Sequence, residues 1–369
     1  MLDFRKVFNY NLKVVFGLKP ISSYQGVRFM NLAKKLTAVF IVIAMIFCFA
    51  ACSNDDAEAQ LDIGTINMGF ITTGDADNDA YTALHYSQFQ NAYGLAGAGN
   101  GQVTVEKKVP AGDYDAMAKA IDDLSSRGCR LIVGMDAGYK ADFEKFAKEN
   151  STIFFAIAGS AADESSVEGN LAVLNASVYQ GEYLAGIAAG TASEKGKVAY
   201  IADSAYAPAD NANVNAFAQG AKSAGAEVFF VNTKDVKAGV DKAKAKDCDV
   251  VYSRNFVADK ETGEKFFTVP ESFNDTMSVV KLTKDGSEFI TGPALNFDFL
   301  YTKIVLNTVN ESFGDLAKFN WDVKDGVVDI FPSKDAKVKA AVDKARDEFM
   351  SGKDSVKIAD ELSKDVTVL

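Results

Sequence analysis

The sequence has few of the residues on which several large classes of function depend. It contains one histidine, so most histidine-based hydrolase and zinc chemistry lacks the side chains that it needs. Four cysteines in 369 residues are too few for a disulfide-stabilised scaffold. Acidic residues outnumber basic ones by 50 to 39, and the net charge of −11 argues against nucleic acid as a partner. The apolar share of 48% is that of an ordinary globular protein, and the length suits two domains.

Basic charge is concentrated in residues 1–51, which carry seven basic residues and one acid. Their net charge of +6 leaves −17 for the rest of the chain. Lys34 and Lys35 precede an uncharged apolar run of about 16 residues, shorter than the roughly 20 that a membrane-spanning helix needs. Small residues follow, and this combination is typical of a secretory signal. Met30 begins a signal of ordinary length and is therefore an alternative start of translation.

The apolar run ends in the sequence FAAC, which resembles the bacterial lipobox, where a peptidase cuts before a cysteine that carries lipid. The chain has Phe49 where leucine is usual. The resemblance implies that residues 1–51 are a signal peptide, that Cys52 carries lipid such as palmitate, and that residues 52–60 form a polar tether. The alternative is an uncleaved anchor with an incidental cysteine. Both interpretations place the body on a membrane, outside the cytoplasm.

The body contains two series of apolar, β-rich runs, separated by segments with the apolar spacing of helices. The predicted strands are 62–71, 102–109, 130–134, 152–158 and 171–175, then 197–202, 227–232, 249–253, 265–269 and 326–331. The predicted helices are 79–93, 114–126, 140–149, 179–191, 209–224, 236–246, 297–312 and 335–350. This alternation predicts an α/β fold with parallel sheets covered by helices on both faces.

A weak internal repeat relates residues 121–133 to residues 240–252. Each segment reads as a helix, a tight turn and a buried strand, with Cys129 or Cys248 entering the strand. We interpret both cysteines as small core residues rather than as a disulfide. The repeat favours two similar lobes over one large sheet.

The predicted lobes are mainly residues 61–176 and mainly residues 177–369. We expect the chain to cross between them more than once, with residues near 297–313 returning to the first lobe. Ligands of such sheets bind beyond the carboxyl ends of the strands, which here line a cleft shared by both lobes. The loops of interest therefore follow Ile71, Gly134, Ala158, Ala202, Ser253 and Val269.

Several segments resemble the basic membrane protein family of bacterial lipoproteins. They are NLAVLNASVYQGEYLAGIAAG at 170–190, KVAYIA at 197–202, NAFAQGAKSAG at 215–225, KDGVVDI at 324–330 and FMSGK at 349–353. The resemblance implies a type I periplasmic-binding-protein fold of two doubly wound, parallel-sheet lobes. It also implies a substrate-binding lipoprotein that passes a nucleoside to an ABC permease, with no catalytic residue, no cofactor and no bound metal.

The family's first ligand loop follows the first strand and ends in Phe-Asn, and by position Tyr81 and Thr82 replace this pair. The resemblance thus implies that Tyr81 stacks on a base. Asp75 and Asp79 in the same loop are candidate ligand contacts, because ribose hydroxyls pair well with carboxylates. Alternatively, Tyr81 is an aromatic residue packed at the start of a helix.

The second ligand loop, GMDAGY at 134–139, is similar to the family's Gly-rich turn with an aromatic residue. This similarity implies that Tyr139 stacks on the other face of the base and that Asp136 is a polar anchor. Asp136 is alternatively a cap for the helix that follows, which is a commoner use of aspartate at this position.

The second lobe departs from the family. After 249–253 there is room for about one helical turn where the family has a full helix, and residues 294–296 lack the family's lysine. Phe256 remains a stacking candidate, and the alternative is a phenylalanine of the core. Pro270 or Glu271 stands where the family has its ribose-binding aspartate, and Glu271 would replace that aspartate with a longer reach.

Other chemistries find little support. Asp75, Asp77 and Asp79 have the spacing of a calcium loop, but its required glycine and glutamate are replaced by Ala80 and Tyr86. No hydrolase or zinc-protease motif occurs, so no enzyme is predicted. Two hypotheses remain. One is a lipid-anchored receptor for an ABC importer, on the periplasmic or outer side of the membrane. The other is a surface lipoprotein that has lost transport and binds a host component or acts as an antigen.

Overall fold

The computed structural model describes residues 66–75, 80–95, 102–159, 165–202, 209–233, 235–253, 277–284, 286–359 and 361–369. The chain forms two compact units, Met1–Asp62 and Ile63–Leu369, and every described residue lies in the second. The predictions for residues 1–51, for Cys52 and for residues 52–60 therefore fall outside the described residues. No helix within these ranges has both the length and the apolar character that are needed to cross a membrane.

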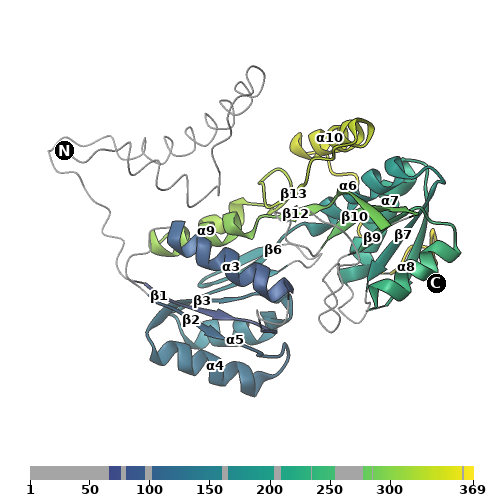
Figure 1. Ribbon diagram of the computed structural model, residues 1–369. Coiled ribbons are helices and arrows are strands. Elements are labelled where there is room, and N and C mark those ends of the chain that lie inside the picture. The colour runs from purple at the N-terminus through teal and green to yellow at the C-terminus, as the bar shows by residue number, and fades with distance from the viewer. Residues whose placement is uncertain are drawn as a thin grey trace, which may run out of the picture. The chain divides into compact units, whose positions relative to one another are not determined.

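The first sheet has six strands in the order β2-β1-β3-β4-β6-β5 (Figure 1). They are β1 (Asn67–Ile71), β2 (Val103–Glu106), β3 (Cys129–Gly134), β4 (Phe154–Gly159), β5 (Ser166–Glu168) and β6 (Leu171–Asn175). All pairs are parallel except β5 with β6. The inner strands are apolar at almost every position, as expected for a sheet that is buried on both faces.

Helices cover both faces of this sheet. They are α3 (Ala80–Leu95) on one face and α4 (Tyr114–Ser126) with α5 (Lys140–Glu149) on the other. Asp113 caps the start of α4, because its side chain accepts a hydrogen bond from the backbone N–H of Ala116. The buried face of the helix repeats at helical spacing through Met117, Ile121 and Leu124. The predicted helix boundaries at 114–126 and 140–149 agree with the structure.

The second sheet has the order β11-β10-β9-β7-β8-β14. Its strands are β7 (Lys197–Ala202), β8 (Glu227–Asn232), β9 (Val250–Ser253), β10 (Ser278–Thr283), β11 (Gly286–Thr291) and β14 (Val366–Val368), and its helices are α6 (Val178–Ala192), α7 (Ala209–Ser223) and α8 (Val236–Ala245). Two parallel-dominated sheets with alternating helices confirm the predicted α/β class.

One part of this sheet differs from the prediction. Strand β10 is antiparallel to both β9 and β11. The hairpin is absent from the sequence prediction, although the Asp-Gly dipeptide at 285–286 between apolar runs is a strong hairpin signal. The predicted strand 265–269 lies outside the described residues.

Helices α6 and α7 approach so closely that their backbones touch. A Cβ atom on Gly186 would lie 2.0 Å from the carbonyl oxygen of Phe217, and one on Gly220 would lie 2.1 Å from that of Tyr183. No larger residue fits at either position. The YLAG stretch that carries much of the family resemblance therefore serves helix packing.

Within the described residues the chain crosses between the two sheets three times. The first crossing leads from β6 into α6. The second leads from β11 through β12 (Pro293–Leu295) into α9 (Phe297–Val309), which packs against α3 and β4. The third leads from the 3₁₀ helix η3 (Phe313–Lys318) through β13 (Val328–Ile330) into α10 (Ala336–Met350), which packs against α6. Strands β12 and β13 pair with each other, so the second and third crossings run side by side.

Candidate functional site

The carboxyl ends of five parallel strands of the first sheet lie next to one another. In the strand register Ile71 pairs with both Glu106 and Gly134, and Gly159 pairs with Asn175. Parallel strands end at the same edge of a sheet, and ligands of such sheets bind there. We call this region the carboxyl edge. It is the described part of the candidate site, because the loops after β7 and β9 lie outside the described residues.

Asp75 lies in the loop after β1 and contacts the end of β2. Its carboxylate accepts a hydrogen bond from Lys107 Nζ at 3.1 Å and lies 3.6 Å from Lys108 Nζ. The Asp75 side chain is 17% exposed, against 45% and 68% for the two lysines. The Lys108 backbone has a φ of 58°, a left-handed conformation that is rare outside glycine and asparagine. The carboxylate is therefore held in place at the carboxyl edge by two cations.

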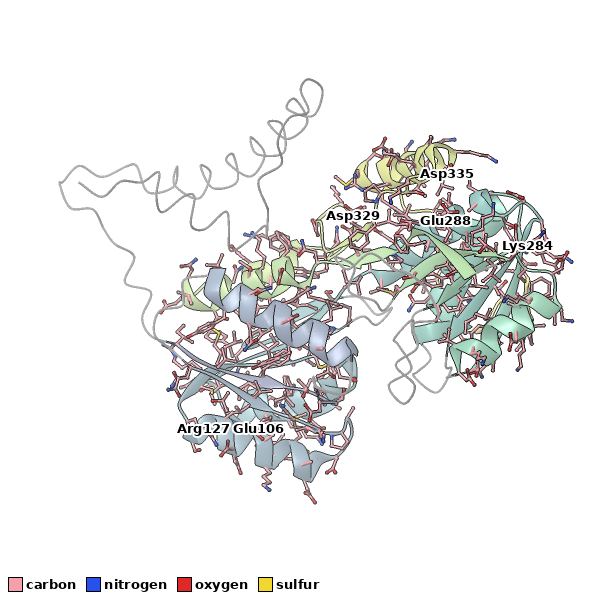
Figure 2. The ribbon with its side chains drawn as sticks, viewed as in Figure 1. Glu106, Arg127, Lys284, Glu288, Asp329 and Asp335 are labelled. Atoms are coloured by element: carbon pink, nitrogen blue, oxygen red, sulfur yellow. The ribbon has the colours of Figure 1, made fainter. Side chains whose placement is uncertain are left out.

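Glu106 also ends β2, yet it belongs to a different environment. Figure 2 shows Glu106 beside Arg127, the residue that follows α4. Burial, together with the neighbouring Asp123 carboxylate, raises the pKa of Glu106. Asp123 in turn accepts a hydrogen bond from Arg127 Nε at 2.7 Å. The Glu106 side chain thus contributes to the packing of α4, whereas its backbone carbonyl accepts a hydrogen bond from the Thr72 N–H in the loop before Asp75.

Tyr139 occupies a position that differs from its predicted one. Its side chain is fully buried, stacks on Phe143 with ring centroids 6.0 Å apart, and donates a hydrogen bond from its hydroxyl to Val109 O at 2.7 Å. A Cβ atom on Gly134 would lie 2.6 Å from the Tyr139 ring, so glycine makes room for it. The predicted stacking on a ligand does not fit this placement, because a fully buried ring presents no face to a ligand. Burial also raises the pKa of the Tyr139 hydroxyl well above its ordinary value.

Asp136 is half-buried at the carboxyl edge and caps the 3₁₀ turn Ala137–Tyr139 that leads into α5. Its Oδ1 atom accepts a hydrogen bond from the backbone N–H of Gly138 at 2.7 Å. This contact agrees with the capping alternative. A role as a ligand anchor would use its second carboxylate oxygen.

The other predicted contacts are described only in part. Tyr81 lies in the first turn of α3, but its side chain is outside the described part of the structure. Asp79, Phe256 and Glu271 lie outside the described residues altogether. Lys107, Lys108 and Asn175 are additional residues of the carboxyl edge that were not predicted from the sequence. The signal for Asn175 was its position at the carboxyl end of a buried strand.

Metal binding finds no support in the described part of the chain. No group of three or more histidine, cysteine, aspartate or glutamate side chains comes together there. Cys129 and Cys248 are free and buried, which confirms that they are core residues rather than partners in a disulfide. Of the three aspartates with calcium-loop spacing, Asp75 alone is described, and it pairs with lysines.

Several solved structures share the fold. An ABC transporter solute-binding protein from Conexibacter woesei DSM 14684 is 15% identical, with a TM-score of 0.57 over 81% of this chain and 100% of that one. A transcriptional activator of the comK gene from Bacillus halodurans is 15% identical, with a TM-score of 0.51 over 79% and 99%. An ABC transporter solute-binding protein from Aeropyrum pernix K1 is 12% identical, with a TM-score of 0.50 over 81% and 95%. At these identities the likeness shows the fold alone, and it confirms the type I periplasmic-binding architecture.

No protein of the curated collections matches the chain. A family model does match: it is described as ABC transporter substrate-binding protein PnrA-like and covers residues 84–363, about three quarters of the sequence. This range includes the carboxyl edge from Lys107 onward and all three crossings. The predicted family resemblance is confirmed, and the chain belongs to the Bmp family of PnrA-like ABC transporter substrate-binding proteins.

Proposed function

We propose that this protein is a lipid-anchored, extracytoplasmic receptor that captures a nucleoside or a related small molecule and passes it to an ABC permease. Family membership supports the substrate-binding role. The observation that carries the proposal is the carboxyl edge, where two lysines pair with the Asp75 carboxylate and where the strands that precede Asp136 and end in Asn175 also terminate. Carboxylate and amide groups in such positions match the hydroxyls of a ribose and the polar edge of a base.

Asp75 is the ribose contact in this proposal. A carboxylate accepts charge-assisted hydrogen bonds from vicinal hydroxyls, and the two lysines orient it before the ligand arrives. Tyr81, at the start of α3, is the proposed stacking residue of the first lobe. Asp79, Phe256 and Glu271 complete the proposed set of contacts, and Tyr139 is withdrawn from it.

A thermal-shift screen of the purified protein tests this function. Nucleosides, free bases and ribose are compared, and a ligand at 100 times its Kd stabilises the protein by about 2.7 kcal/mol. Asp75→Ala removes most of the shift, whereas Asp122→Ala, an exposed aspartate on α4, leaves it intact. The nucleoside proposal fails if no nucleoside produces a shift at millimolar concentration.

The anchor is tested separately in cells. Wild-type protein incorporates labelled palmitate and partitions into the detergent phase, and Cys52→Ala does neither. Equal partitioning of the variant would show that the apolar run, rather than a lipid, holds the protein on the membrane.

The second candidate is a surface lipoprotein without a transport role. The reversed direction of β10 favours it, because an antiparallel strand places its carboxyl end at the opposite edge of the sheet and so removes one strand end from a shared cleft. A folded protein that binds no nucleoside, base or sugar would support this candidate.

A further inference from the structure

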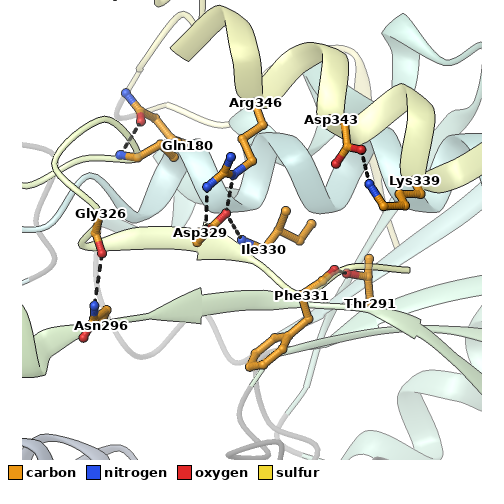
Figure 3. Close-up of polar contacts among 11 residues, drawn as sticks. Gln180, Thr291, Asn296, Gly326, Asp329, Ile330, Phe331, Lys339, Asp343 and Arg346 are labelled. Carbon is orange, nitrogen blue, oxygen red and sulfur yellow. Dashed lines mark hydrogen bonds and ion pairs between the residues drawn. The ribbon is translucent and has the colours of Figure 1, made fainter. Parts of the chain in front are cut away.

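The three crossings converge on one turn, residues 320–327, which we call the crossing turn. The first crossing contacts it through the backbone N–H of Ser177, which donates to Trp321 O at 3.0 Å. The second contacts it through Asn296, whose backbone N–H donates to Val327 O at 2.7 Å and whose Nδ2 donates to Gly326 O at 3.3 Å (Figure 3). The third crossing contains the turn itself. Movement of one crossing therefore acts on the other two.

The crossing turn is stiffened from within. The Oδ2 atom of Asp325 accepts hydrogen bonds from the backbone N–H groups of Asn320 and Trp321, at 2.6 and 3.0 Å. Trp321 is fully buried and has a φ of 56°, a strained conformation for a bulky residue that only the surrounding contacts maintain. A turn held in this way moves as a unit rather than bending residue by residue.

A neighbouring salt bridge joins the third crossing to α10. Arg346 donates from Nε to Asp329 Oδ1 at 2.7 Å and from Nη2 to Asp329 Oδ2 at 2.9 Å (Figure 3). This bidentate pair fixes β13 on α10, so β13 moves together with that helix.

Gln180 connects the crossing turn to a segment far away in the sequence. It lies in the first turn of α6 and is 3% exposed. Its Oε1 atom accepts a hydrogen bond from the backbone N–H of Val323 at 3.0 Å, and its Nε2 atom donates to Asp354 Oδ2 at 2.8 Å. Figure 3 shows the first of these contacts beside the crossings. One amide thus bridges the crossing turn and the start of residues 353–359, which we call the C-terminal strap.

The C-terminal strap has no helix or strand of its own and is held by side chains of α6 and α7. Tyr179 donates from its hydroxyl to Asp354 Oδ2 at 2.7 Å. Gln219 donates to Lys357 O at 2.8 Å and accepts from the Lys357 backbone N–H at 3.0 Å. Gln219 therefore holds the strap as Gln180 does, but its partners lie on the strap and on its own helix and not on the crossing turn.

We propose that Gln180 is a positioning residue that couples the C-terminal strap to the crossing turn, so that the strap and all three crossings move as one hinge body. Both the oxygen and the nitrogen of its buried side-chain amide are hydrogen-bonded, the oxygen to the crossing turn and the nitrogen to the C-terminal strap. The consequence for ligand capture rests on the proposed function, because capture requires the two sheets to rotate about the crossings. The coupling itself does not depend on any ligand.

Hydrogen exchange of the full-length protein without ligand, followed by mass spectrometry, tests the coupling. Asp354→Ala is the decisive variant, because its side chain bonds to Tyr179, Gln180 and the Val356 backbone but to no atom of the crossing turn. We expect it to speed exchange within residues 320–327 by about tenfold. Gln180→Met, which keeps the volume of the side chain and loses both hydrogen bonds, produces the same pattern.

Gln219→Ala is the matched control, and it speeds exchange in the strap but not in the crossing turn. The proposal is overturned if Asp354→Ala leaves exchange in residues 320–327 unchanged, or if Gln219→Ala loosens the turn as much. If Gln180→Met fails to fold, the comparison of Asp354→Ala with Gln219→Ala still tests whether the strap is coupled to the crossing turn. A failure to bind nucleosides would overturn the proposed function, but it would not affect the coupling, which is measured without ligand.

Discussion

His85 should make the stability of this protein fall between pH 7.5 and pH 5. The side chain lies on α3 and is fully buried against α9. Its Nδ1 atom is hydrogen-bonded to the Tyr301 hydroxyl at 2.6 Å, and its ring centroid lies 4.0 Å from that of Phe297. Desolvation by burial lowers its pKa from 6.5 to about 3. The imidazole therefore stays neutral in the folded protein at pH 5, whereas in the unfolded chain it is mostly protonated.

The sign and the size of the effect follow from proton linkage. Below pH 6.5 the unfolded state binds more protons than the folded state, so stability is lost as the pH falls towards about 3. At pH 5 the loss is about 2 kcal/mol, and at pH 7.5 it is close to zero. The value at pH 5 hardly depends on the folded-state pKa, because that pKa lies far below 5.

Urea unfolding of wild-type protein and His85→Gln at pH 7.5, 6 and 5 measures this loss. The chain has one histidine, so the carboxylate contributions cancel in the comparison. Relative to the variant, the wild type should lose about 2 kcal/mol of unfolding free energy between pH 7.5 and 5. Tyr301→Phe should keep the same pH dependence, because burial rather than the hydrogen bond causes the shift. A constant difference between wild type and His85→Gln across this range would refute the reasoning.

Two further predictions concern the contact between α6 and α7 and the two buried cysteines. Gly186→Ala should cost about 3 kcal/mol or more in urea unfolding, because its Cβ would meet the backbone of α7, whereas Gly94→Ala, in open space on α3, should stabilise by about 0.5–1 kcal/mol. Similar effects of the two changes would contradict the backbone contact. Burial raises the pKa of Cys129 to about 11 and that of Cys248 to about 12, so at pH 8 both thiols should resist a thiol reagent in the native protein and react in urea. Mass spectrometry of labelled peptides identifies them, and rapid native labelling of either cysteine would contradict their burial.

The fold class and the family could be predicted from the sequence, because both depend on local patterns. Apolar β-rich runs alternating with helical spacing define a parallel α/β sheet wherever the runs meet in space. Cys129 and Cys248 could be assigned to the core because each enters an apolar strand, and the boundaries of α4 could be read from Asp113 and the residues after it. These features need no knowledge of the neighbours that the chain acquires on folding.

The parts of the site that depend on neighbours could not be predicted. Tyr139 follows a glycine-rich turn, as a ligand-stacking residue would. Its ring is nevertheless fully buried against Phe143 of α5, and its hydroxyl donates a hydrogen bond to Val109 O. The Asp75 carboxylate pairs with Lys107 and Lys108, which are more than 30 positions away in sequence. The sequence by itself determined which residue types stand at the ends of strands. Only the tertiary structure decided which of them face solvent, because burial depends on the segments that pack over a side chain, and those segments lie far away along the chain.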